Sequence, residues 1–188
     1  ANPVAPNGHG IMYGNTKDDQ FSHYEAGADH FLNAMFTFDA NEKLTGMIVN
    51  VPCPSQTSEM FTIQTADYWN EVREGVKKEF GEAVYVLPQC AAAGDLSPRI
   101  LHYKQAQARR MKLKYGLEYD GTGLMNQKNK AMAERYDIAE RILLGLKDIY
   151  SWAKKDIQSQ PAVRHAVQDM KLARRLVTDE EKKWCEEN

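Results

Sequence analysis

One short segment carries the side chains of this chain that are best suited to chemistry. It reads Gly94-Asp95-Leu96-Ser97-Pro98, and the residues just before it, Cys90-Ala91-Ala92-Ala93, are all small. Asp95 could orient a hydroxyl, a water or a metal ligand, and Ser97 could donate a hydrogen bond or attack a carbonyl. The same residue types are also typical of an Asx or Ser turn that ends a strand. The spacing therefore leaves a catalytic and a structural interpretation open.

The elements before this segment predict how it is positioned. Residues 44–51 and 83–87 are apolar runs of strand length, and residues 65–80 between them form a helix with one apolar stripe made of Trp69, Val72, Val76 and Phe80. This βαβ unit, at about 44–88, predicts two parallel strands. Loops that follow parallel strands meet at one edge of a sheet, where binding sites form.

The two loops at that edge supply the other candidate site residues. Ser55, Thr57 and Ser58 follow the first strand, and Gln89 and Gly94 follow the second. We predict that these five residues bind substrate. We also predict that Ser97 and Asp95 are catalytic and lie in a concave site beside the loop at 52–58.

The remaining pattern completes an α/β fold with a mainly parallel or mixed sheet and packed helices. Residues 1–28 are irregular and 31–38 form a hairpin with the strand at 44–51. A long helix is expected at 130–155, a strand at 162–173 and a helix at 179–187 with Thr178 as N-cap. We therefore expect an irregular segment at 1–28 and one α/β domain, or a portion of a larger domain, over 29–188.

Composition narrows the function classes. The chain has 188 residues, of which 43% are hydrophobic and 27% charged, and its formal net charge is −2. These values exclude disordered and collagen-like classes, and a near-neutral chain is not an obvious nucleic-acid binder. The basic stretch 99–115 interleaves Tyr103 and Tyr115, which leaves a nucleic-acid contact open beside a solvated helix face. No apolar run of about 18 residues predicts a membrane span, and residues 1–10 have neither the basic start nor the apolar run of a signal peptide.

Cysteine and histidine spacing gives weaker candidates. Cys53, Cys90 and Cys185 make neither a disulfide framework nor a zinc-finger spacing. A thiolate nucleophile at Cys53 or Cys90 lacks a histidine close in sequence. His23 and His30 are the metal-ligand candidates, but catalytic zinc needs three protein ligands, so we predict no stoichiometric catalytic zinc in this chain and leave the cofactor open.

Three segments together resemble the neutral/alkaline, non-lysosomal ceramidase family, in a bacterial branch, over about Tyr13 to Arg110. They are Leu87-Pro88-Gln89-Cys90 with Gly94 to Pro98, the strand 48–51 with Thr57-Ser58, and Ala66-Asp67-Tyr68-Trp69 in the helix. The resemblance implies a zinc hydrolase that cleaves the amide (N-acyl) bond of a lipid-like substrate. It also implies a secreted or periplasmic protein.

The sequence departs from that family at defined positions. Ser55 stands where the family has a zinc-binding histidine, Arg99 stands where it usually has asparagine, and its Thr-His-Thr-His element does not occur in the chain. We therefore expect an upstream segment of the same protein to be missing here. The functional hypothesis is a ceramidase-like hydrolase. The alternative is a non-catalytic binding or structural domain that keeps the fold and has lost the zinc centre.

Overall fold

The structure is a computed structural model that describes residues 3–4, 8, 10–11, 16, 21–24, 27–98, 103–118 and 127–188. These residues group into two compact units, Ala1–Ile157 and Gln158–Asn188. The sequence-based division into 1–28 and 29–188 stays a prediction. None of the helices in the described ranges has the length and apolar character that a membrane crossing requires.

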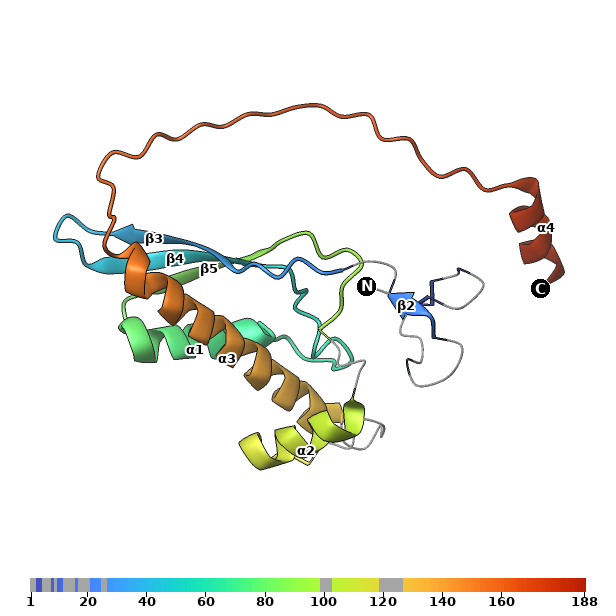
Figure 1. Cartoon of the computed structure of the whole chain (residues 1–188), viewed down its shortest axis with the longest axis horizontal. Helices are drawn as coiled ribbons and strands as arrows, with labels where there is room; N and C mark the ends of the chain where they lie inside the picture. Colours follow the sequence, from blue (N-terminus) through green and yellow to red (C-terminus); the bar gives the residue numbers. More distant parts are fainter. Residues whose placement is uncertain are drawn as a thin grey trace. The chain divides into compact units, whose positions relative to one another are not determined.

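In the part that the structure describes, the first unit contains two sheets and three helices. A small antiparallel pair joins β1 (Pro3–Val4) to β2 (His23–Tyr24). The main sheet has the order β3-β4-β5, and the helices α1, α2 and α3 belong to the same unit (Figure 1). The bounds of these elements are β3 Asn33–Phe38, β4 Leu44–Val51, α1 Tyr68–Phe80, β5 Tyr85–Cys90, α2 Lys104–Tyr115 and α3 Gln127–Ala153.

The main sheet is mixed, which confirms the predicted α/β fold. β3 pairs antiparallel with β4 as the expected hairpin. β4 pairs parallel with β5, with Gly46 opposite Tyr85 and Val51 opposite Cys90. The strand, helix and strand predicted over 44–88 therefore form a βαβ unit.

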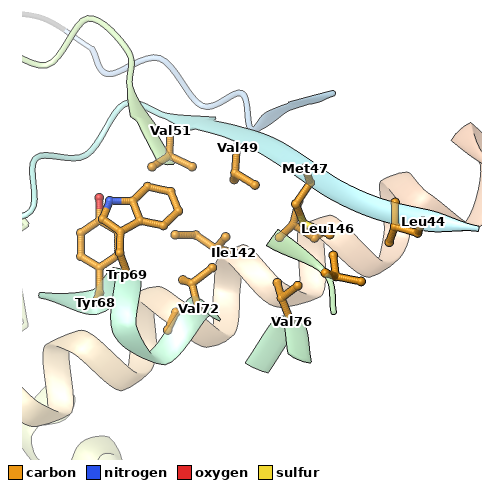
Figure 2. Close-up of a cluster of buried hydrophobic side chains, with 12 residues drawn as sticks. Leu44, Met47, Val49, Val51, Tyr68, Trp69, Val72, Val76, Ile142 and Leu146 are labelled. Atoms are coloured by element: carbon orange, nitrogen blue, oxygen red, sulfur yellow. The ribbon is translucent and has the colours of Figure 1, made fainter. Parts of the chain in front are cut away.

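One face of this sheet is covered by α1 and α3. Alternating side chains of β4 point to that face because successive strand residues point to opposite sides. Figure 2 shows the resulting core, to which the elements contribute Met47, Val49, Val51, Trp69, Val72, Val76, Ile142 and Leu146. Burying each such side chain contributes about 1.5–3 kcal/mol. The absence of a side chain at Gly75 lets α3 come close, since a Cβ there would collide with Leu143.

Several element boundaries differ from the sequence-based ones by two or three residues, and two of these differences have a clear physical reason. Helix α1 begins at Tyr68 rather than near Thr65, because Asp67 is its N-cap and its carboxylate accepts a hydrogen bond from the Tyr68 N–H. Strand β5 does not end at Leu87 but continues through Pro88 to Cys90. Proline is tolerated there because β5 is an edge strand, and one side of an edge strand makes no ladder hydrogen bonds.

Helix α2 packs on the first half of α3. Met111 of α2 is fully buried in a cluster with Ala133. Arg110 donates to both carboxylate oxygens of Asp137, at 2.8 and 2.9 Å. Burial raises the pKa of Asp137, but hydrogen bonds from Arg110 and the charge of Arg141 outweigh it and hold that pKa below its ordinary value. Some of the basic residues in 99–115 therefore serve the packing of two helices, and a nucleic-acid contact stays an untested alternative.

The second unit, Gln158–Asn188, contains one helix. This is α4 (Asp179–Glu187), and Thr178 caps it as predicted: its Oγ1 accepts from the Glu181 N–H, and its own N–H donates to the Glu181 carboxylate. The strand predicted at 162–173 is wrong, because these residues have no regular structure and Val163 is 87% exposed. A strand needs a partner for its N–H and C=O groups, and within Gln158–Asn188 no strand is present.

Candidate functional site

The parallel pairing of β4 and β5 brings two loops to one edge of the sheet. Val51 ends β4 opposite Cys90, which ends β5. The Ala91 N–H then donates a hydrogen bond of 3.0 Å to the Val51 carbonyl. The loops that follow, which we call the β4 loop (residues 52–67) and the β5 loop (residues 91–98), therefore start side by side, as the sequence predicts.

The β4 loop uses its polar groups to hold the start of α1. The Thr57 hydroxyl donates to both carboxylate oxygens of Asp67 at 2.8 Å, and the Ser58 N–H donates to one of them at 2.8 Å. Asp67 is 3% exposed and has a φ of +52°, a backbone conformation that few non-glycine residues adopt. The hydrogen bonds stabilise this conformation, so Thr57 has a structural role whatever else it contacts.

A second contact closes the β4 loop against α1. Tyr68 is fully buried, and its hydroxyl donates a hydrogen bond of 2.5 Å to the Cys53 carbonyl. Burial also raises the pKa of the Cys53 thiol to about 11 and the pKa of Tyr68 above its ordinary value. A thiol with that pKa is protonated at neutral pH, which argues against Cys53 as a thiolate nucleophile.

Among the described residues, the polar side chains of the β5 loop have no such partners. Gly94 and Asp95 are exposed. The Ser97 Oγ is buried, and it has no hydrogen-bond partner among the described residues. The turn in this loop is closed by the backbone, since the Leu96 N–H donates to the Ala93 carbonyl at 3.1 Å. In the described part of the chain neither Asp95 nor Ser97 makes the side-chain hydrogen bond that an Asx or Ser turn requires.

The other predicted substrate-binding residues are spread around this edge. Ser55 is exposed in the β4 loop. Gln89 lies inside β5 rather than in the loop, in register with Asn50. It is on the sheet face opposite Val86, and Val86 packs against the core. No hydrogen bond within the described ranges joins Ser97 to the β4 loop, so a single concave site shared by both loops stays a prediction.

The described residues do not provide a zinc site. His23 lies in β2 with its Nδ1 3.0 Å from the Ser22 hydroxyl, and both His23 and His30 are exposed. Over the ranges that the structure describes, no three His, Cys, Asp or Glu side chains come together as metal ligands. His9, His102 and Arg99 lie outside the described residues. Since these side chains do not fit the metal that the family resemblance implies, we derive no step through zinc.

A cleft that sequence analysis did not identify lies between the β4 loop and two helices. It has a volume of about 390 Å³, and it is lined by Ser58 and residues 61–63 of the β4 loop, Glu71 of α1 and several residues of the first half of α3. Ser58 is part of the lining, is 4% exposed, and its Oγ has no hydrogen-bond partner in the described part of the chain. The lining residues span positions 58 to 136, so no contiguous motif could reveal them.

Comparison with known proteins identified no relative of this chain. No family model, curated protein or solved structure matches the chain. The functional argument therefore depends on the sequence motifs and on the geometry of the two loops.

Proposed function

We propose that this protein is a ceramidase-like hydrolase that acts on an amide (N-acyl) bond at the common edge of β4 and β5. The observation that supports the proposal is the Ser97 Oγ, which is buried in the β5 loop without a partner among the described residues. A buried hydroxyl left unpaired costs about 1–3 kcal/mol. Native proteins contain few such groups, and a ligand or a catalytic role is one explanation for them.

The proposed reaction consumes water and yields a carboxylic acid and an amine. Ser97 contacts the reacting carbonyl, and Asp95, exposed in the same loop, orients the water. If Ser97 attacks, its oxygen forms an ester with the acyl group, the amine leaves with a proton, and water then cleaves the ester. If Ser97 only donates a hydrogen bond, water attacks directly and the hydroxyl stabilises the developing oxyanion.

Hydrolysis of a panel of N-acyl substrates, with short-chain ceramide among them, tests the proposal. Ser97→Ala should lower kcat by about 10²-fold or more. Ser159→Ala is the matched control, since Ser159 is exposed in the second unit, and it should keep full activity. Mass spectrometry of the quenched enzyme separates the two roles of Ser97, because only the attacking serine gains the mass of the acyl group.

The assay needs a second form of the protein. The family resemblance implies that an upstream segment contributes to the site, so the 188-residue chain and a chain extended upstream are both assayed. Full activity of Ser97→Ala in whichever form is active would contradict the proposal, as would the absence of hydrolysis in both forms.

One observation favours a second candidate, a non-catalytic binding or structural domain that keeps the fold. Two of the groups expected to meet substrate, the Thr57 hydroxyl and the Ser58 N–H, are hydrogen-bonded to Asp67. A binding domain would bind N-acyl compounds without releasing product. Calorimetric titration of the same panel, alongside the hydrolysis assay, distinguishes it from an enzyme.

A further inference from the structure

The cleft beneath the β4 loop has the dimensions of a ligand site. Its volume of about 390 Å³ falls within the range of roughly 300–1,000 Å³ found for small-molecule pockets. Its walls come from the β4 loop, α1 and α3, and neither Asp95 nor Ser97 lines it. An occupant of this cleft is therefore independent of the hydrolase proposed for the β5 loop.

Ser58 places a hydroxyl in this cleft that is held in position and has no hydrogen-bond partner among the described residues. Its N–H is bound to the buried Asp67 carboxylate at 2.8 Å, so the residue is held in place. Its Oγ is buried and has no hydrogen-bond partner among the residues that the structure describes. A hydroxyl both donates and accepts, so a polar group of a bound molecule would remove the penalty of leaving it unpaired.

The charged groups of the cleft favour an anion. Glu71 of α1 pairs with Arg135 of α3, whose Nε donates to the carboxylate at 3.3 Å and whose Nη2 makes a second contact. A guanidinium has five N–H donors, so the pair leaves further donors on Arg135. Lys128 also lines the cleft, and it has no acidic partner in the described ranges. Among the lining side chains, Lys128 and Arg135 are positive and Glu71 is negative, which leaves one positive charge; the Asp67 carboxylate, bonded to the Ser58 N–H, is not part of the lining.

Apolar side chains complete the lining. Met132 lies four residues after Lys128 and three before Arg135, so the three share one face of α3. Phe61 and Ile63 of the β4 loop line the cleft as well. We infer that this cleft binds a small amphipathic monocarboxylate, with the carboxylate beside Ser58, Lys128 and Arg135 and the apolar body against Met132 and Phe61.

Calorimetric titration of the full chain with octanoate and with octylammonium tests the charge selection. The two probes share an alkyl chain and differ in the sign of the head group. Octanoate should bind saturably at one site per chain, and octylammonium should bind at least about tenfold more weakly, which is ~1.4 kcal/mol. Equal binding of the two probes, or no saturable binding of octanoate, would overturn the inference.

Three variants and one control variant locate the site. Thr62→Trp, at an exposed lining residue, should abolish octanoate binding by filling the cleft, whereas Gln64→Trp, exposed in the same loop but outside the lining, should not. Lys128→Met should weaken octanoate binding about tenfold. Ser58→Ala should weaken it without destabilising the fold, because it removes an unpaired hydroxyl. Octanoate binding that survives Thr62→Trp and Lys128→Met would contradict the assignment.

Discussion

The β4 loop and the β5 loop leave neighbouring parallel strands at the same edge, yet their polar side chains differ in whether they have hydrogen-bond partners. In the β4 loop, the Thr57 hydroxyl and the Asp67 carboxylate pair with each other at 2.8 Å. In the β5 loop, Asp95 is exposed and the Ser97 Oγ is buried without a partner among the described residues. The Thr57–Asp67 pair thus stabilises the fold in the β4 loop, whereas the Ser97 Oγ in the β5 loop, like the Ser58 Oγ at the cleft, has no partner in the described ranges.

This difference separates structural from functional candidates. A hydroxyl that already donates to a buried carboxylate contributes to stability, and a ligand could use it only by breaking that hydrogen bond. A buried hydroxyl with no partner lowers the free energy of unfolding, and a ligand can bind it without breaking a hydrogen bond. The β5 loop is therefore the better place for chemistry, and the comparison between the loops can be measured.

Replacing Asp67 in the β4 loop and Asp95 in the β5 loop should give the largest difference in the free energy of unfolding. Asp67→Ala removes the acceptor for Thr57, for the Ser58 N–H and for the Tyr68 N–H. We expect it to lower the free energy of unfolding by about 3 kcal/mol, since it breaks a buried hydrogen-bond network and a helix cap. Asp95→Ala is the matched control and should change it by less than about 0.5 kcal/mol. Urea unfolding followed by circular dichroism provides both values, and equal losses would show that the loops do not differ.

Thiol reactivity tests how closed the β4 loop is without any mutation. Cys53 lies near the start of the β4 loop, and burial raises the pKa of its thiol to about 11, whereas Cys90 and Cys185 are exposed. At pH 8 the Cys53 thiol should be ionised on the order of a hundredfold less than an exposed thiol. A colorimetric thiol reagent should therefore react quickly with two cysteines and slowly with the third until the chain is unfolded. Three equal rates in the folded chain would mean that the β4 loop is open.

Much of the main fold could be predicted from the sequence. The apolar runs at 44–51 and 83–87 and the stripe at Trp69, Val72 and Val76 determine the βαβ unit through local periodicity, and the structure has it. The strand expected at 162–173 failed because alternation alone does not supply a pairing partner. The end of β5 was misplaced because proline is excluded only from central strands, and edge position is a property of the whole sheet.

The site was predictable only in part. Parallel pairing places the two loops at one edge, and this follows from element order. Whether a hydroxyl has a hydrogen-bond partner depends on contacts between residues that are not adjacent in the sequence, such as Thr57 with Asp67. No local pattern reveals these contacts. The cleft between Ser58 and Arg135 depends on how α3 packs against α1, which sequence spacing does not specify.

The most direct test of the central claim compares two hydroxyl deletions, one in each loop, by their free energies of unfolding. Thr57→Val removes a donor to a buried carboxylate and should cost about 1.5–3 kcal/mol. Ser97→Ala removes an Oγ that has no partner in the described ranges and should leave stability within about 0.5 kcal/mol or raise it. A loss above about 1 kcal/mol in Ser97→Ala would show that Ser97 is a structural residue and contradict the account.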